Sequence, residues 1–323
     1  MGVIVTGIRF VAVCAAGLAL AGCATFIPFQ SSNEVIVRVG DKPDIYPVRA
    51  VAGAYASSAI LATLAYQDNI DTRVFGEMQP QANKKLAGWR RVPLPKYVCP
   101  AGRICAGEVG GQLWISSDNK ACREAVVVFR GTVATSFDDW IANFHWFHRL
   151  TPIDDYYDQA RDNIGTVVAI AERQGCAGRI IAVGHSLGGG LAQHVAYANP
   201  KIRTVYAFDP SFVIGSTDFN LLGLPIHREG RKFDYVYEHG EILAFLRFFG
   251  RLFHPYEACN PRIRTVRFNT LTGSIINQHR IVDFTKKLVG LSQAPVKPDI
   301  KPDVPPPRMD KKFKLRAGCP VAA

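Results

Sequence analysis

The feature that most constrains the fold is a short apolar run that ends in a serine flanked by glycines. Residues 180–183 are apolar, as is typical of a buried strand, and residues 184–188 follow at once as Gly-His-Ser-Leu-Gly. Small and helix-favouring residues come next. This order of strand, sharp turn and helix is the setting in which a G-x-S-x-G sequence exposes a nucleophilic hydroxyl. We therefore expect Ser186 to be a nucleophile. We expect Gly184 and Gly188 to be required, because side chains there would collide with the adjacent strand and helix.

Strands and helices alternate along the remainder of the chain, which predicts a mainly parallel α/β sheet flanked by helices. Apolar spacing predicts helices over residues 44–68, 154–173 and 279–291. Short strands are expected over residues 89–98, 111–116, 124–129, 203–208, 233–237 and 263–268. The run at 124–129 is continuously apolar, which favours a strand that is covered on both faces.

The N-terminus predicts export. Arg9 is the only charge in the first 22 residues, and the apolar stretch from Phe10 to Leu20 has the length of a signal-peptide core rather than of a bilayer-spanning helix. Leu20-Ala21-Gly22-Cys23 resembles the bacterial lipoprotein box. This resemblance implies that Cys23 is acylated and becomes the new N-terminus, which would tether the protein to a membrane without a spanning helix. Ordinary signal cleavage, with Cys23 a plain thiol, is the alternative.

Charge and cysteine content agree with an envelope location. The net charge of +11 favours anionic surfaces such as lipid head groups, while no basic-aromatic motif suggests nucleic acid as a partner. Ala24, directly after Cys23, implies the outer membrane by the same lipoprotein resemblance. Without Cys14 and Cys23, six of the eight cysteines remain, enough for up to three disulfides in an oxidising compartment. They are Cys99, Cys105, Cys122, Cys176, Cys259 and Cys319. Their spacing does not suit a zinc site, so no metal is expected.

The chain divides into four expected segments. Residues 1–22 are a lipoprotein signal peptide, 23–43 a lipidated and partly extended leader, 44–291 one α/β domain, and 292–323 a tail. Prolines alternate with lysine and aspartate in the tail, a composition that cannot form a core and predicts an extended, solvated chain.

A second motif lies at the end of the predicted strand 124–129. Residues 127–132 read Val-Val-Phe-Arg-Gly-Thr, residues 139–143 read Asp-Trp-Ile-Ala-Asn, and Gly-His-Ser-Leu-Gly-Gly follows at 184–189. Together these motifs resemble the class 3 lipase family, α/β-hydrolases related to the fungal triacylglycerol lipases, over about residues 45–291. The resemblance implies an α/β-hydrolase fold and an oxyanion hole. Its donors would be the backbone N–H and hydroxyl of Thr132 and the backbone N–H of Leu187.

A serine nucleophile needs a general base, which in this fold comes late in the chain. Of the eight histidines, His279 lies at the start of the last predicted helix, where the family places its base. His239 is the main alternative. His145, His148, His185 and His194 are expected to have packing, surface or lid roles.

The base in turn needs a carboxylate that orients it, and this residue is less clear from the sequence. In the family, a strand that ends in Gly-Ser-Pro follows the elbow helix. The aspartate usually comes after the next strand. Glu241 best matches that slot, so this chain departs from the usual residue. Asp234 and Asp209 are the alternative acids, and Asp209 ends the preceding strand, where the family usually has Ser-Pro.

These residues predict a serine carboxyl-ester hydrolase of the lipase or phospholipase type, anchored in the bacterial envelope and working through an acyl-enzyme without metal or organic cofactor. The expected partners are a lipid or ester substrate and the membrane, while protein partners are not indicated. Residues 140–150 are rich in aromatic side chains, with Trp140, Phe144, Trp146 and Phe147, and could form either a lid or a core helix. Two other functions remain open: a non-catalytic envelope scaffold, which is favoured by the departure from aspartate at Glu241, and a thioesterase or peptidase on the same fold.

Overall fold

The computed structural model describes residues 48–97, 109–119, 121–131, 156–211, 219, 223–243 and 261–293, and the backbone of three short strands at 34–38, 104–105 and 153–154. The expected signal peptide, Cys23, Thr132, the candidate lid and the tail beyond Gln293 lie outside these residues.

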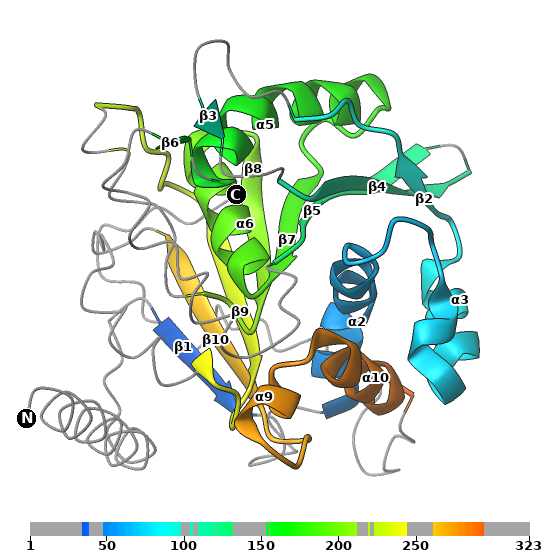
Figure 1. Ribbon diagram of the computed structural model, residues 1–323. Helices are drawn as coiled ribbons and strands as arrows, with labels where there is room; N and C mark the ends of the chain where they lie inside the picture. The colour runs from blue at the N-terminus through cyan, green and yellow to red at the C-terminus, as the bar shows by residue number, and fades with distance from the viewer. Residues whose placement is uncertain are drawn as a thin grey trace, which may run out of the picture.

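An eight-stranded sheet with the order β1-β10-β9-β8-β7-β5-β4-β2 forms the centre of the fold (Figure 1). Its strands are β1 (Glu34–Arg38), β2 (Trp89–Val92), β4 (Gly111–Asp118), β5 (Ala121–Phe129), β7 (Ile180–His185), β8 (Ile202–Phe208), β9 (Lys232–Glu238) and β10 (Arg262–Phe268). The six strands from β5 to β1 are parallel, and β4 and β2 complete the sheet in antiparallel fashion. A separate pair joins β3 (Ile104–Cys105) to β6 (Ile153–Asp154). The predicted α/β-hydrolase fold with a mainly parallel sheet is confirmed.

Helices cover both faces of this sheet. The helices within the described residues are α2 (Val48–Leu64), the 3-10 helix η1 (Thr72–Met78), α3 (Gln79–Leu86), α5 (Tyr156–Arg173), α6 (Leu187–Ala198), α9 (Ile275–Gln278) and α10 (Ile281–Leu291). Figure 1 shows α5 and α6 on one face and α2 and α10 on the other. Strand β5 explains why both layers form: Ala125 and Val127 join the core under α5 and α6, while Val126 and Val128 join the core under α2 and α10. Successive side chains of a strand point to opposite faces, so a continuous apolar strand is buried twice.

Two elements differ from the sequence-based expectation. Residues 34–38, which we expected in a leader, form strand β1 at the edge of the sheet, paired in parallel with β10. The helix expected over 279–291 is α10, which begins two residues later, at Ile281, and the short helix α9 precedes it; His279 is the C-terminal cap of α9, and Arg280 is extended. The break at Arg280 separates His279 from the packed helix and leaves it in the loop region at the end of the sheet.

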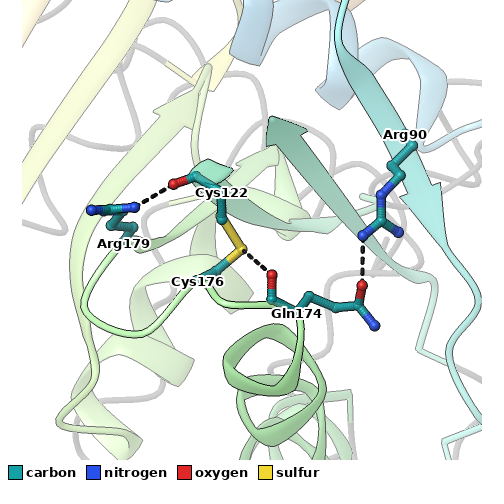
Figure 2. The surroundings of a disulfide bond; sticks show 5 residues. All are labelled: Arg90, Cys122, Gln174, Cys176 and Arg179. Carbon is teal, nitrogen blue, oxygen red and sulfur yellow. Dashed lines mark hydrogen bonds between the residues drawn. A yellow bond between two sulfur atoms is a disulfide. The ribbon is translucent and has the colours of Figure 1, made fainter. Parts of the chain in front are cut away.

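One disulfide lies within the described residues, between Cys122 and Cys176 (Figure 2). It joins the start of β5 to the turn after α5, and the Arg179 guanidinium donates to the carbonyl of Cys122. The parallel strands β5 and β7 begin near this disulfide and end on the opposite side of the sheet. The disulfide therefore links the chain at the amino-terminal ends of these strands, whereas Ser186 follows the carboxyl end of β7. No helix in the described ranges combines the length and hydropathy needed to cross a bilayer.

Candidate active site

Ser186 sits on a sharp turn between β7 and α6, as predicted. Its backbone has φ 57° and ψ −124°, a conformation that side-chain-bearing residues rarely adopt. Backbone hydrogen bonds hold it on both sides: its N–H donates to the carbonyl of Phe208 at 3.0 Å, and its carbonyl accepts from Gly189 at 3.0 Å, Gly190 at 3.4 Å and Ser211 at 2.9 Å. Strand β8 and the helix start thus fix the strained residue in place.

The two elbow glycines are required for the reason predicted from the sequence. A Cβ added to Gly184 would lie 2.0 Å from the carbonyl oxygen of Gly188, and one added to Gly188 would lie 2.2 Å from the carbonyl oxygen of Phe129. Neither oxygen belongs to a flexible side chain that could move away. Any larger residue at either position would therefore force α6 away from β7 or β5.

Glu241 and His279 meet beside this elbow. Oε2 of Glu241 lies 2.7 Å from Nδ1 of His279 and also accepts the N–H of Leu243 at 2.7 Å. The Glu241 side chain is fully buried, so its carboxylate is desolvated and directed by these contacts. The ring of His279 lies 4.8 Å, centroid to centroid, from the ring of His185, the residue before Ser186. The structure therefore brings together the elbow and the residues predicted as acid and base.

Asp234, one of the alternative acids, lies in a different environment. It receives two hydrogen bonds from the guanidinium of Arg264, one of them at 2.8 Å from Nε, and the hydroxyl of Tyr55 donates to it at 2.8 Å. Desolvation by burial is the main cause that raises the pKa of Tyr55, and the Asp234 carboxylate adds to it. Asp234 thus belongs to a buried cluster between α2, β9 and β10.

Asp209, the other alternative acid, lies close to the site. It ends β8 in a left-handed conformation, with φ 39°, and is fully buried. Its Oδ1 accepts the N–H of Glu238 at 3.0 Å, which ties the end of β8 to the end of β9. One carboxylate oxygen of Asp209 and one ring nitrogen each of His185 and His279 lie within 4.8 Å of one another.

Within the described ranges, His185, Asp209 and His279 place their possible ligand atoms close enough together to hold a metal ion. Both ring nitrogens of His185 already make hydrogen bonds, to Tyr66 and to the carbonyl of His279. A metal ligated by His185 would have to break one of these bonds. The donor set therefore fits a hydrogen-bonded site better than a metal centre.

The two predicted oxyanion donors are Leu187, at the start of α6, and Thr132, after the end of β5. Leu187 is the first residue of α6, where helix geometry provides no carbonyl partner for the first amides. Thr132 lies outside the described residues, but Gly131 directly before it is buried against the elbow. A Cβ on Gly131 would lie 3.2 Å from Cβ of Ser186 and 2.6 Å from the carbonyl oxygen of His185. The end of β5 therefore approaches the nucleophile closely, as an oxyanion loop requires.

Sequence reasoning did not find Tyr66 or Glu238. The Tyr66 hydroxyl accepts the N–H of Gly131 at 3.1 Å and lies 2.8 Å from Nδ1 of His185, and burial raises its pKa. Glu238 at the end of β9 accepts hydrogen bonds from the backbone of Thr270 and Leu271 and from the Thr270 hydroxyl. It thereby fixes the loop that leads from β10 to His279, and burial raises the pKa of its carboxyl group.

Comparison with protein-family models gives one match. Residues 57–208, a little under half of the chain, match a Tle-like phospholipase domain. The matched region contains the elbow and the end of β5 and stops before Glu241 and His279. It supports a lipase- or phospholipase-like family, and with it an ester hydrolase. The acid and the base rest on the geometry described above.

Solved structures of similar shape include lipases and an esterase. Lipase II from Rhizopus niveus is 16% identical, with a TM-score of 0.40 over 64% of this chain and 79% of that chain. The Rhizomucor miehei lipase–propeptide complex is 12% identical, with a TM-score of 0.35 over 60% and 62%. The carboxylesterase EstE1, cloned from a metagenomic library, is 16% identical, with a TM-score of 0.36 over 76% and 98%. At these scores the superpositions add nothing to the argument from the site. A search of curated proteins finds no match.

Proposed function

We propose that this protein is a serine ester hydrolase of the lipase or phospholipase type, with Ser186 as nucleophile, His279 as general base and Glu241 as the acid that orients it. The 2.7 Å contact between Glu241 and Nδ1 of His279, beside the strained Ser186, carries the proposal. Glutamate in place of the usual aspartate was the sequence feature that favoured a non-catalytic scaffold. This contact removes that support, because the longer side chain reaches the imidazole.

The proposed reaction follows from these positions. Oγ of Ser186 attacks the ester carbonyl while Nε2 of His279 takes its proton, and the buried Glu241 carboxylate stabilises the imidazolium. The same proton passes to the leaving alcohol, and an acyl-enzyme remains. Water then attacks the acyl group as His279 acts again as base, which releases the carboxylic acid and restores Ser186.

The oxyanion would be stabilised from the elbow and from the end of β5. The N–H of Leu187 lies at the positive end of the α6 dipole. The N–H of Gly131 donates to Tyr66, which leaves the next amide, that of Thr132, as the expected donor from β5.

A lipid substrate is favoured by the surface around His279. Ile275 and Ile276 on α9 are exposed by 51% and 44%, and the adjacent Arg280 side chain is 60% exposed. Two exposed isoleucines beside a cation fit the boundary between acyl chains and phosphate head groups. This surface supports the proposal of a lipid ester, with the phospholipid class suggested by the family match.

We further propose that the protein is held in the cell envelope, in the outer membrane, through acylated Cys23. The lipoprotein-like sequence and the net charge of +11 support this, as does a buried disulfide of the kind found in oxidising compartments.

The test of the chemistry is Ser186→Ala, with Ser58→Ala as a control that removes the hydroxyl of a buried serine in α2. Labelling by a fluorophosphonate probe and hydrolysis of p-nitrophenyl esters, triglyceride emulsions and phospholipid vesicles would be measured for both. We expect Ser186→Ala to lose labelling and hydrolysis, while Ser58→Ala keeps them. Hydrolysis by Ser186→Ala within about tenfold of wild type, at an unchanged circular dichroism spectrum, would refute the assignment.

The test of the location is Cys23→Ser, measured by metabolic labelling with an alkyne fatty acid. We expect the label to disappear and the protein either to leave the membrane or to stay bound by an uncleaved signal. Soluble protein that begins near Ala24 should keep its activity on short, water-soluble esters. Equal labelling of the wild type and Cys23→Ser would show that the lipoprotein assignment is wrong.

A further inference from the structure

A chain of hydrogen bonds crosses the site from Tyr66 to the main chain of His279. The hydroxyl of Tyr66 accepts the N–H of Gly131 at 3.1 Å and lies 2.8 Å from Nδ1 of His185. On the other side of the same ring, Nε2 of His185 lies 2.9 Å from the carbonyl oxygen of His279. Tyr66 itself is held at the end of α2, where the side-chain amide of Gln112 donates to the carbonyls of Leu64 and Gln67.

Donor and acceptor rules give this chain one direction. A carbonyl oxygen only accepts, so Nε2 of His185 carries a proton and donates it to His279. In a neutral imidazole the other ring nitrogen, Nδ1, is then an acceptor, so the Tyr66 hydroxyl donates to it while accepting the N–H of Gly131. A neutral imidazole protonated at Nε2 satisfies all three bonds. The carbonyl of His279 and the hydroxyl of Tyr66 therefore favour the same tautomer of His185.

The three segments joined in this way are the ones that the proposed reaction needs. Gly131 precedes the expected oxyanion residue Thr132, His185 precedes Ser186, and His279 is the proposed base. Glu241 fixes the ring of His279 through Nδ1, while His185 fixes its main chain through the carbonyl. The base is thus held at two points, and one of these is the residue adjacent to the nucleophile.

Among the described residues, a phenol, an imidazole and a carboxyl group face His185. Tyr66 comes from the end of α2, His279 from the end of α9, and Asp209, within 4.8 Å, from the end of β8. Asp209 in turn accepts the N–H of Glu238, so its carboxylate is held in place beside the two imidazoles.

We propose that Tyr66 and His185 are positioning residues, which set the distance between the Ser186 turn and the His279 base and hold the end of β5 in register with both. The inference rests on the proposed function for its kinetic consequence. For a neutral imidazole, the hydrogen-bond direction and the tautomer of His185 follow from the contacts themselves and can be measured separately.

The test compares Tyr66→Phe with Tyr55→Phe. Both tyrosines come from the same helix region, both are buried or nearly so, and each loses only a hydroxyl with buried hydrogen bonds; that of Tyr55 serves Asp234, away from the site. Both variants should lose some thermal stability. On a short, water-soluble ester we expect kcat to fall by about tenfold or more in Tyr66→Phe with little change in KM, because misplaced reacting groups slow the chemical step. Tyr55→Phe should keep its kcat.

Two further measurements separate positioning from a loss of stability. His185→Gln keeps an amide donor for the His279 carbonyl and should retain more kcat than His185→Leu, which keeps none. Imidazole ¹⁵N chemical shifts should show His185 protonated at Nε2 in the wild type and in Tyr55→Phe, with signal at the Nδ1-protonated form rising in Tyr66→Phe.

The outcomes distinguish this inference from the proposed function. If Ser186→Ala is inactive but Tyr66→Phe matches Tyr55→Phe in kcat within about twofold, the positioning role is overturned while the hydrolase assignment stands. If Ser186→Ala stays active, the hydrolase assignment fails. The ¹⁵N measurement then decides the rest: a His185 protonated at Nδ1 in the wild type overturns the proposed direction of the chain.

Discussion

Removal of the Cys122–Cys176 disulfide should destabilise the protein without altering the site. The two cysteines are 54 residues apart in sequence, and both are buried. In the chain-entropy model, a closed loop of this length restricts the unfolded state by an amount equivalent to about 4 kcal/mol at 25 °C. For a domain of this size, that corresponds to a fall in Tm of about 10 °C.

Alanine at both positions is the suitable change, because it leaves neither a buried thiol nor a buried hydroxyl. Thermal and urea unfolding of the double variant would be followed by circular dichroism, with and without reductant. The change in unfolding free energy that reductant causes in the double variant comes from the remaining cysteines. Subtracting it from the change that reductant causes in the wild type leaves the contribution of the Cys122–Cys176 disulfide.

Activity gives the second readout for this variant. The disulfide joins the start of β5 to the turn between α5 and β7 (Figure 2), whereas Ser186 directly follows the carboxyl end of β7. We therefore expect kcat at 25 °C to stay within about twofold of wild type for the folded double variant. A change in unfolding free energy below about 1 kcal/mol would refute the argument from loop length.

Three other changes test the site. Glu241→Gln should lower kcat by about 10⁴-fold, the scale seen when the acid of a catalytic triad becomes an amide, and a larger loss in Asp209→Asn would show that the acid is Asp209. Gly131→Ala should abolish hydrolysis with the fold retained by circular dichroism, because the new methyl group would lie 2.6 Å from both the His185 carbonyl oxygen and the Tyr66 hydroxyl; activity near wild type would contradict the close approach of β5. Burial raises the pKa of Glu238, so the stability that its proton contributes is present at pH values below its unfolded pKa of about 4.3 and is lost as pH rises through the folded value. Glu238→Gln keeps an oxygen for Thr270 and Leu271, so its unfolding free energy relative to wild type should increase from pH 4 to pH 7, and a flat difference would contradict this.

The elements that the sequence predicts best are those with a strong local pattern. The elbow depends on five consecutive residues, and β5 and β7 on runs of buried apolar side chains, so neighbours in sequence suffice for both. Strand β1 also had a local signal, since Glu34-Val-Ile-Val-Arg38 is rich in β-branched residues, but its position between two polar segments favoured a leader. The short helix α9 was not expected, because it has only four residues and buries none of them, whereas the start of α10 was expected to within two residues.

The residues that sequence reasoning left open or missed depend on contacts between distant segments. The choice among Glu241, Asp234 and Asp209 required the position of His279, which follows Glu241 by 38 residues. Tyr66 is 119 residues from His185 and 65 from Gly131, and nothing in its own surroundings distinguishes it from a core tyrosine. The contacts of such residues form only in the folded protein, where the carboxyl ends of several parallel strands lie close together.

The two departures from the family pattern are connected in the structure. Where the family has Ser-Pro after the strand that follows the elbow helix, this chain has Asp209-Pro210, and the Asp209 carboxylate accepts the N–H of Glu238 at the end of β9. That bond holds the end of β9 against β8, and the proposed acid, Glu241, lies in the turn that follows. Glutamate is longer than aspartate by one methylene. Its Oε2 lies 2.7 Å from Nδ1 of His279 and also accepts the N–H of Leu243. An aspartate at 241 would retract the carboxylate by roughly one carbon–carbon bond, about 1.5 Å, beyond hydrogen-bonding distance. Glutamate at 241 therefore has the side-chain length that the proposed acid–base pair requires in a turn held by Asp209.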